Sequence, residues 1–414
     1  MSVSPVPGDV LPDDLRDDPW LGADPSNPDY RENPAPFLRR LREVAPVSLT
    51  PLGSWRLARY EDCIRLLREV PSGVRFADGT PAIGARSGVA AGPGEFMLQQ
   101  DPPAHTRLRR LVSKAFTPRA VERLRERVRE NVRALLDEAL AQDEVDVIAA
   151  LALPVPSTVI CEMMGVPLAD RPRFTEWTGD ATHLLAAEFS PEDVVQRGLA
   201  AAGQLALYFQ DLLAERRTRL GDDMLSQLIR AEEEGDRLSP GELLVQSIGL
   251  LIAGFETTIG LIGNGVYQLL RHPDELARLR RDPELIRTAV DECLRFDGPI
   301  GATLRILHED AAFSGVRIPK DSRVMALLDA ANRDPEKFPD PERFDVGRAP
   351  NEHLAFGGGV HHCLGAHLAR MEAQEAIGAL VARTRELELR ETRREWGRSL
   401  FRVPARLRIG VRPA

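Results

Sequence analysis

The spacing of apolar residues predicts that most of this chain is helical. Apolar positions recur with helical periodicity through nearly the whole segment from Asp101 to Arg295. A capping side chain followed by proline marks helix starts at Thr117-Pro118, Ser239-Pro240 and Asp282-Pro283. The segment from Ser239 to about Arg271 is apolar on nearly all sides. We therefore expect one helix of roughly thirty residues there, crossing the middle of a large core.

Short runs rich in β-branched residues predict a minor sheet. These runs are Gly315 to Pro319, Ser322 to Met325 and Leu407 to Val411. Between Asn332 and Pro350 the prolines prevent regular structure and predict an ordered, irregular coil. The fold class is therefore mainly α with a minor β portion (α+β). We expect residues 1–20 to be a flexible N-terminal segment and residues 21–414 to form a single domain.

Composition excludes several classes of function. The 414 residues are 43% hydrophobic and 28% charged, which supplies a large core. A formal net charge of −9 argues against nucleic acid as a partner. The first residues lack the basic and apolar segments of a signal peptide, so we expect a cytoplasmic protein. The strongly apolar stretch from Ile248 to Phe255 is shorter than the ~20 residues of a membrane helix, so no membrane anchor is expected. A dinucleotide-binding Gly-x-Gly-x-x-Gly pattern after a strand is missing, so electrons would come from outside the chain.

Cys363 is the position most informative about chemistry. It follows the run Phe356-Gly357-Gly358-Gly359-Val360-His361-His362 and precedes a predicted helix from Leu364 to about Arg383. The unpaired N–H groups and the positive dipole at a helix start favour a thiolate over a thiol. Glycines permit close approach of the backbone to a flat macrocycle. The alternative is that a lone cysteine is a small buried hydrophobic residue. The other cysteines are too widely spaced for a zinc or iron–sulfur site: Cys63, Cys161 and Cys293.

The run around Cys363 resembles the haem-binding signature of the cytochromes P450. That signature consists of Phe, two residues, Gly, a basic residue two places before the cysteine, Cys, one residue and Gly. The matching positions are Phe356, Gly359, His361, Cys363 and Gly365. The resemblance implies haem b as cofactor, with the Cys363 thiolate as axial ligand of the iron and Phe356 tuning its potential. It also implies the family's single triangular, helix-rich prism with small β-sheets, with haem between the helix of Glu256 and the helix after Cys363.

A second motif, Ala253-Gly254-Phe255-Glu256-Thr257-Thr258, lies in the middle of the long apolar helix. A carboxylate and a hydroxyl there can relay protons to dioxygen. The alternative is a threonine hydroxyl that bonds to a carbonyl one turn earlier. By resemblance, Glu256 and Thr257 match the family's acid–alcohol pair, whereas Ala253 and Gly254 leave room for oxygen over the haem.

Glu292-x-x-Arg295 is followed by Arg305 and by the proline-rich coil that contains Arg343. A Glu-x-x-Arg pair by itself is an ordinary helix-surface pair, and this chain contains several more. The order of the residues resembles the family's Glu-Arg-Arg core. By that resemblance, Arg343 closes an ion network with Glu292 and Arg295 that braces the coil beneath the haem.

The two haem propionates need cationic partners. By resemblance these are His105 and Arg109, one turn apart at the start of a helix, together with Arg305 and His361. The nearby basic residues become candidates for a docking face for an acidic ferredoxin, although a solvated helix face is the default interpretation of such a cluster. They are Arg107, Arg110 and Lys114.

These motifs predict an enzyme that activates O2 and oxidises a mainly hydrophobic organic substrate, such as a secondary metabolite. Its partners are a ferredoxin and a ferredoxin reductase that carry electrons from NAD(P)H, and the protein is expected to be a monomer. Oxidative coupling or cyclisation by the same oxidant is an alternative, and a haem-based sensor or electron carrier is an alternative from another class. By analogy the pocket walls are Pro71 to Gly94 and Phe174 to Phe189. Four apolar residues would line the pocket, although each is also a credible core residue: Leu250, Ala253, Ile300 and Phe401.

Overall fold

The computed structural model describes residues 18, 20–25, 27–82, 96–184, 191–221, 223–230, 232–233, 236–397 and 401–414. Residue contacts divide the chain into two compact units, each made of two sequence segments. Unit 1 comprises Met1–Ala82 and Thr288–Cys363, and unit 2 comprises Ile83–Arg287 and Leu364–Ala414. Almost all of the predicted N-terminal segment 1–20 lies outside the described residues, and a single domain over 21–414 stays a prediction.

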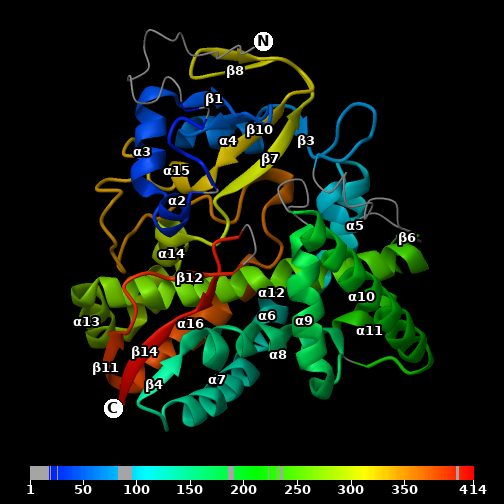
Figure 1. Cartoon of the computed structure of the whole chain (residues 1–414). Helices are drawn as coiled ribbons and strands as arrows, with labels where there is room; N and C mark the ends of the chain where they lie inside the picture. Colours follow the sequence, from blue (N-terminus) through cyan, green and yellow to red (C-terminus); the bar gives the residue numbers. More distant parts are fainter. Residues whose placement is uncertain are drawn as a thin grey trace. The chain divides into compact units, whose positions relative to one another are not determined.

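Unit 1 is built on a five-stranded sheet of order β1-β2-β10-β7-β3, in which β2 and β10 are parallel and the other neighbours antiparallel (Figure 1). Its strands are β1 Val47–Leu49, β2 Trp55–Leu57, β3 Ser72–Gly73, β7 Ala302–Leu307 and β10 Arg323–Leu327, and a separate hairpin is formed by β8 Ala311–Phe313 and β9 Val316–Ile318. Its helices are α2 Pro28–Glu32, α3 Ala35–Val44, α4 Tyr60–Arg68, α14 Ile286–Asp297, which starts just outside the unit, α15 Leu328–Ala331 and the short 3₁₀ turn η10 Gly359–His361. The apolar side chains of α4, the sheet and the β8–β9 hairpin share one core cluster.

Unit 2 is predominantly helical, as the apolar periodicity predicts. Its longer helices are α5 Ala104–Ser113, α6 Pro118–Glu122, α7 Arg125–Ala139, α8 Pro154–Met164, α9 Arg171–Thr182, α10 Glu192–Thr218, α11 Met224–Arg230, α12 Pro240–Arg271, α13 Pro273–Arg281 and α16 Ala366–Ala382. Short 3₁₀ or π turns are η4 Met97–Gln99, η5 Lys114–Phe116, η6 Ile148–Ala152, η7 Leu168–Asp170 and η9 Pro283–Leu285. Thr117 and Asp282 cap α6 and η9 through their side chains, which confirms two of the predicted starts.

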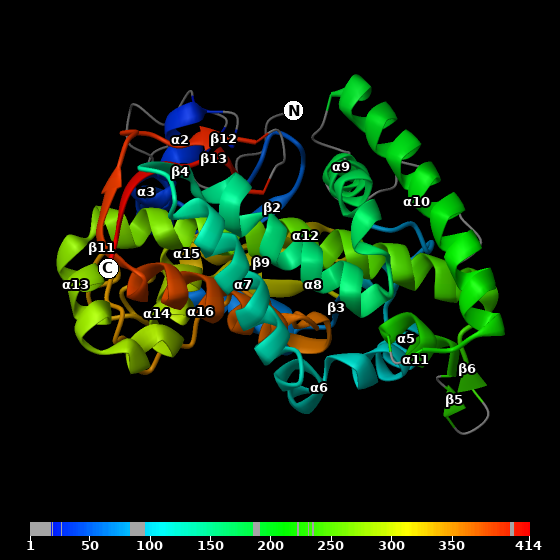
Figure 2. The same cartoon turned by 90° about the horizontal axis from the view of Figure 1, so that it is seen from below.

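The third predicted start confirms the long apolar helix. The Ser239 hydroxyl accepts from the Glu242 N–H at 3.2 Å, and the Glu242 carboxylate accepts from the Ser239 N–H at 2.7 Å, so a reciprocal capping box starts α12. α12 packs against α8, α9, α10 and α16, and Figure 2 shows α8 running alongside it. Burial on most sides explains why its sequence has no polar face.

The apolar stretch from Ile248 to Phe255 underestimates the length of the apolar helix, so the comparison with a membrane helix needs a correction. By length and composition, α12 is one helix that could cross a membrane, and 56% of its most apolar window is buried inside the protein. Counting only the strongly apolar run underestimated it, because glycine, serine and threonine residues extend the apolar helix without adding charge. Its contacts with four other helices of unit 2 are those of a core helix.

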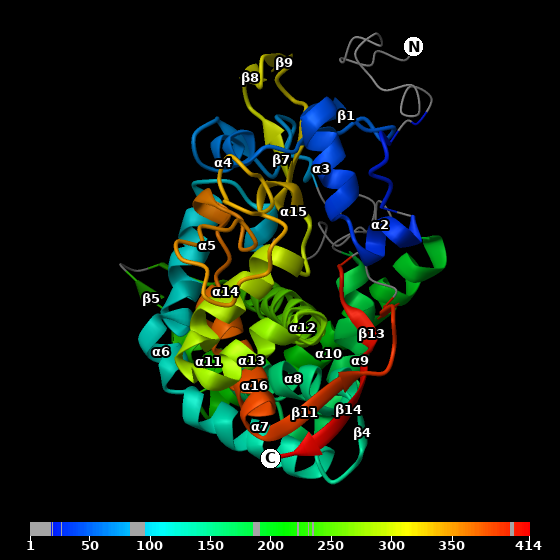
Figure 3. The same ribbon diagram turned by 90° about the vertical axis from the view of Figure 1, so that its left-hand side faces the viewer.

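The described residues of unit 2 also form seven short strands. β11 Thr384–Leu389, β14 Arg408–Pro413 and β4 Glu144–Asp146 form a three-stranded antiparallel sheet, seen side by side in Figure 3. Two further antiparallel hairpins are β12 Glu395–Trp396 with β13 Pro404–Arg406 and β5 Glu232–Glu233 with β6 Asp236–Arg237. The three strands predicted from β-branched runs correspond to β9, β10 and β14, and 332–350 is the predicted irregular coil.

Candidate functional site

The loop that precedes Cys363 is closed by its own backbone. The Cys363 N–H donates to the Phe356 carbonyl at 2.9 Å, and the His362 N–H donates to the Gly359 carbonyl at 3.1 Å. α16 begins at Ala366, three residues after the cysteine, and ends at Ala382, so the predicted helix is confirmed to within two residues. The hydrogen bonds hold Cys363 at a fixed place just ahead of a helix N-terminus, where a thiolate is favoured.

Gly359 can be replaced by no other residue without moving this loop. Its φ is +66°, and a Cβ built on it would lie 1.9 Å from the Leu67 carbonyl oxygen at the end of α4. The neighbouring Gly358 would place a Cβ 3.3 Å from the Leu67 Cβ. Gly358 and Gly359 therefore serve the close packing of the loop on α4, and the approach of the loop to a macrocycle stays a prediction.

Cys363 differs from the other cysteines in its exposure. Cys63, Cys161 and Cys293 are buried, whereas Cys363 is exposed. Burial raises the pKa of the Cys161 thiol to about 12 and raises the pKa of Cys63 and Cys293 further. The buried-hydrophobe alternative therefore describes three of the four cysteines, and the fourth is the thiol accessible to a ligand.

Arg305 and the Cys363 loop line one hollow of unit 1. The hollow encloses about 210 Å³ and is bounded by Arg305, Gly358 to Val360 and Leu67 to Ser72. Arg305 lies on β7 and is buried, and its Nη1 donates to the Leu304 carbonyl at 2.8 Å and to the Thr303 hydroxyl at 3.2 Å. The structure thus brings Arg305 close to the loop of His361 and Cys363, and its role toward a propionate stays a prediction.

α12 has an accessible window in the middle of its otherwise buried length. Ile252, Ala253, Glu256 and Thr257 are half-buried and Gly254 is exposed, while the helix before and after them is mostly buried. A Cβ on Gly254 would meet only the Ile160 Cδ1, at 4.0 Å. The second motif therefore presents small and polar groups at an open surface of unit 2.

The hydroxyls of Thr257 and Thr258 both bond back along α12. Thr257 Oγ1 donates to the Ala253 carbonyl at 3.2 Å, and Thr258 Oγ1 donates to the Gly254 carbonyl at 3.3 Å. This is the back-bonding alternative considered for Thr257. Both distances exceed the ~2.7–2.8 Å usual for a hydroxyl donor, so these bonds are weak enough to be exchanged.

These residues fit a haem. The chain offers one exposed cysteine thiol for the iron, small residues at Ala253 and Gly254 of the α12 window for an oxygen-binding face, and cationic groups for propionates. On α5, His105 is buried and Arg109 half-buried, one turn apart. Phe356 and His361 are half-buried and Gly365 is the residue before α16.

The ion network of unit 1 requires a correction of the role given to Arg343. Glu292 and Arg295 are fully buried and paired twice, at 2.7 and 2.8 Å. Arg348, and not Arg343, brings the second guanidinium to Glu292, at 3.2 Å. Arg343 is exposed and contributes its backbone carbonyl, which accepts from both Arg295 and Arg348. The turn from Asp345 to Arg348 directs the later arginine inward.

The predicted pocket residues divide between accessible and core positions. Ala253 and Phe401 are half-buried, whereas Leu250 is only 7% exposed. Ile300 packs against the core cluster of unit 1, which is the alternative considered for it. Of the predicted pocket walls, residues 83–94 and 185–189 lie outside the described residues.

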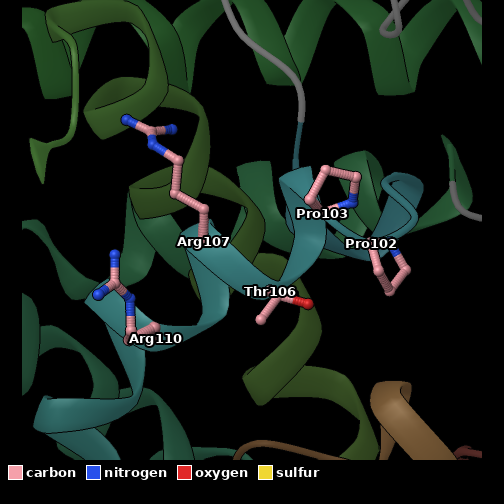
Figure 4. Close-up of a pocket in the computed structure, with 5 residues that line it drawn as sticks. All are labelled: Pro102, Pro103, Thr106, Arg107 and Arg110. Atoms are coloured by element: carbon pink, nitrogen blue, oxygen red, sulfur yellow. The ribbon is translucent and has the colours of Figure 1, made fainter.

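The basic residues after Pro103 lie on the outer side of α5. A hollow of about 560 Å³ is lined by Pro102, Pro103, Thr106, Arg107 and Arg110, and Figure 4 shows both arginines extending from the same side of the helix. Arg107 is ion-paired with Glu242 at the start of α12, at 2.5 Å, whereas Arg110 and Lys114 are exposed. This face of α5 is separate from the face of His105 and Arg109.

Fold and site together define a haem-thiolate protein of helical architecture. The chain belongs to the cytochrome P450 family, whose model matches residues 76–395. It is 42% identical to cytochrome P450 107B1 of Saccharopolyspora erythraea over 92% of both chains. It is also 42% identical to the mycinamicin IV hydroxylase/epoxidase of Micromonospora griseorubida, over 89% of this chain and 93% of that one.

Solved structures of cytochromes P450 have the same fold as this chain. The cytochrome P450 PksS of the bacillaene polyketide synthase of Bacillus subtilis 168 superposes with a TM-score of 0.84 at 34% identity, covering 94% of this chain and 99% of that one. The protein is therefore a bacterial cytochrome P450 and a haem-thiolate monooxygenase, using haem b, O2 and electrons from NAD(P)H through redox partners. The predicted fold class is confirmed.

Two charged residues with buried contacts were not predicted from the sequence. Arg348 follows the proline-rich coil, where spacing does not reveal which arginine turns inward. Glu372 on α16 is 2% exposed, and burial raises its pKa to about 8, while a hydrogen bond with Thr258 opposes that rise. A charged residue on the core side of an apolar helix is the pattern that can reveal such an acid.

Proposed function

We propose that the protein hydroxylates or epoxidises a mainly hydrophobic organic substrate in the bacterial cytoplasm, as a monomer, with electrons supplied by a ferredoxin and its reductase. In the hydroxylation, R–H, O2, two electrons and two protons give R–OH and water, and NAD(P)H is the ultimate reductant. The bound haem supplies the activation of dioxygen. Cys363 holds the iron, His105, Arg109, Arg305 and His361 hold the propionates, and α12 supplies protons.

The observation that carries this proposal is the placement of Cys363. It is the exposed cysteine in a chain whose other three are buried, and its loop is hydrogen-bonded at the start of α16. The test is the spectrum of the reduced, carbon-monoxide-bound protein, in which a thiolate ligand gives the long-wavelength Soret band. We expect Cys363→Ala to lose this band and Cys161→Ala, the control, to keep it. A band that survives in Cys363→Ala would refute the assignment.

Proton delivery is assigned to Glu256 and Thr257. Both lie in the accessible window of α12, the carboxyl beside the hydroxyl in sequence. The Thr257 hydroxyl donates its proton in a weak hydrogen bond to the Ala253 carbonyl. Its oxygen can still accept a hydrogen bond from a second donor. We expect Thr257→Ala to consume NAD(P)H with less product and more peroxide, and Thr257→Ser to restore coupling. Peroxide yield per NAD(P)H measures this, and equal yields in all three proteins would refute the relay.

The substrate class follows from the relatives and from the apolar residues near the window. One relative is named a mycinamicin IV hydroxylase/epoxidase and another a vitamin D(3) 25-hydroxylase, and both names describe the oxidation of an organic molecule. Oxidative coupling is the second candidate, because it uses the same residues and differs only in the fate of the substrate. Screening secondary metabolites for a Soret shift, followed by product analysis, separates the two outcomes.

The electron donor is proposed to dock at the exposed basic residues of α5. Arg110 and Lys114 are exposed, whereas Arg107 is half-buried. An acidic ferredoxin is therefore expected to depend on Arg110 and Lys114 more than on Arg107. Charge reversal of Arg110 should slow reduction by ferredoxin at low salt and have little effect at high salt. Stopped-flow reduction rates at two ionic strengths test this.

A further inference from the structure

A buried arginine lies between two aromatic rings on α12 and β12. Arg394 is 6% exposed, and its guanidinium carbon lies 4.3 Å from the ring centroid of Tyr267 and 4.3 Å from that of Trp396. A guanidinium this close to a ring is attracted by the ring quadrupole, and more strongly when water is excluded. Tyr267 belongs to α12 and Trp396 to β12, so the cation joins the helix to the hairpin.

Asn264 ties both arms of the same hairpin to α12. Its side chain is buried, its Oδ1 accepts from Arg394 Nη1 at 2.9 Å, and its Nδ2 donates to the Arg402 carbonyl at 2.8 Å. Since an amide oxygen only accepts and an amide nitrogen only donates, the two partners fix the orientation of the amide. Arg394 precedes β12 and Arg402 lies two residues before β13, so one side chain bonds to a residue ahead of each strand.

Close packing supports the same attachment. A Cβ on Gly263 would lie 3.6 Å from the Pro404 Cγ on β13 and 2.6 Å from the Ile148 Cδ1, so the glycine permits the hairpin and η6 to approach α12. Figure 3 shows β13 beside α12. The Gly397 N–H donates to the Val403 carbonyl at 3.1 Å, and this bond links the two arms. Gly263, Asn264 and Tyr267 are spaced so that they share one face of the helix.

We propose that Arg394 is a positioning residue for substrate selection, which fixes the β12–β13 hairpin, and with it Phe401, relative to Ala253 of α12. The inference rests on the proposed oxidation of an organic substrate, because Phe401 and Ala253 are the accessible members of the pocket expected for that function. Phe401 is half-buried, and its carbonyl accepts from the Val403 N–H at 2.9 Å, so its place follows that of β13. A bulky ligand that reaches the hairpin depends on this placement, whereas a small ligand at the iron does not.

The test uses two azole probes of different size on the haem-loaded enzyme. Imidazole and 4-phenylimidazole both bind haem iron and report binding by a Soret shift. In Arg394→Met we expect the Kd of imidazole to stay within about twofold. The Kd of 4-phenylimidazole should rise about tenfold, because the hairpin is no longer fixed where the larger probe meets it. Arg406→Met is the matched control. Arg406 lies on β13 with an exposed side chain paired with Glu395 at 2.8 Å, and both Kd values should stay at the wild-type level.

Amide hydrogen exchange gives a second measurement that needs no probe. The Gly397 and Val403 N–H groups report the attachment of the hairpin, and we expect both to exchange at least about tenfold faster in Arg394→Met. Arg394→Lys retains the charge but loses the planar stack, so it should lie between wild type and Arg394→Met. Exchange at the wild-type rate together with an unchanged ratio of the two Kd values would overturn the proposal.

Two other outcomes are also decisive. Equal weakening of both azoles would show a general structural role for Arg394 and would overturn the role in selection. If Arg394→Met does not fold, Tyr267→Leu removes one ring and should shift the 4-phenylimidazole Kd about threefold, with a wild-type Kd refuting the proposal. Failure of the wild-type enzyme to bind either azole would instead refute the proposed haem function, and amide exchange would still test the attachment of the hairpin.

Discussion

Two glutamates with the same degree of burial have opposite electrostatic environments in the two units. Glu292 of unit 1 is fully buried and accepts from the guanidinium groups of Arg295 and Arg348. Glu372 of unit 2 is 2% exposed, and burial raises its pKa to about 8, opposed only by a hydrogen bond with Thr258. Burial alone therefore does not decide whether a carboxyl group is charged; its partners do.

The difference reflects what each region does. The coil after α15 has little regular secondary structure, so its backbone carbonyls need other donors. Arg295 supplies them: its Nη1 donates to the Asn332 and Pro341 carbonyls at 2.8 and 2.9 Å. Glu292 neutralises that arginine and also accepts from the Asp345 N–H at 2.9 Å. The backbone groups of α16 are hydrogen-bonded within the helix, so they need no arginine and no glutamate to pair with it. Glu372 therefore lies as a neutral acid against α12.

The largest loss of stability is expected from breaking the ion pair between Glu292 and Arg295. Arg295→Met leaves the buried Glu292 short of a partner and frees two coil carbonyls. We expect a loss of about 3–5 kcal/mol in the free energy of unfolding, measured by urea denaturation of the haem-loaded enzyme. Arg295→Lys keeps the charge but loses the paired geometry, so its loss should be smaller.

The double variant Glu292→Gln with Arg295→Met is the control for this prediction. It removes the stranded charge, so it should be less destabilised than Arg295→Met alone. A single variant that loses less than about 1 kcal/mol would show that the network contributes little, as is usual for exposed pairs.

The raised pKa of Glu372 predicts that the stability of the protein depends on pH. Because the folded-state pKa of Glu372 is about 8 and the ordinary value is 4.5, the folded protein binds more protons than the unfolded chain between these values. The contribution of Glu372 is therefore fully present below about pH 4.5 and is lost as the pH rises through 8, by at most about 1.4 kcal/mol per pH unit. Glu372→Gln should remove this slope and be more stable than wild type at pH 8.

Urea denaturation at pH 6 and pH 8 measures the slope. Glu375→Gln is the matched control on the same helix, since Glu375 is paired with Arg125 and Arg129, at 2.5 and 2.9 Å. It should lower the free energy of unfolding by a similar amount at both pH values. A stability difference between wild type and Glu372→Gln that is equal at pH 6 and pH 8 would contradict the assignment of a neutral acid.

The two glutamates also show where sequence reasoning succeeds. α12 and its Ser239 cap were predictable because capping and apolar periodicity are local properties. Glu292 with Arg295 was singled out among several Glu-x-x-Arg pairs because the residues that follow it resemble the family's Glu-Arg-Arg core, and the buried pair is confirmed. The inward turn of Arg348 and the contacts of Arg394 with α12 depend on how segments distant in sequence pack, so no local pattern revealed them.

The smallest predicted loss of stability distinguishes Arg348 from Arg343 in the coil. Arg348 donates to Glu292 at 3.2 Å and to the Pro339 carbonyl at 2.8 Å, whereas the Arg343 side chain is exposed. We expect Arg348→Gln to lose about 1–2 kcal/mol in the free energy of unfolding, less than Arg295→Met, because Glu292 retains its nearer partner. Arg343→Gln should stay within about 0.5 kcal/mol of wild type. The reverse order of these two losses would restore Arg343 as the third member of the network, and the comparison between the glutamates would then rest on Arg295 alone.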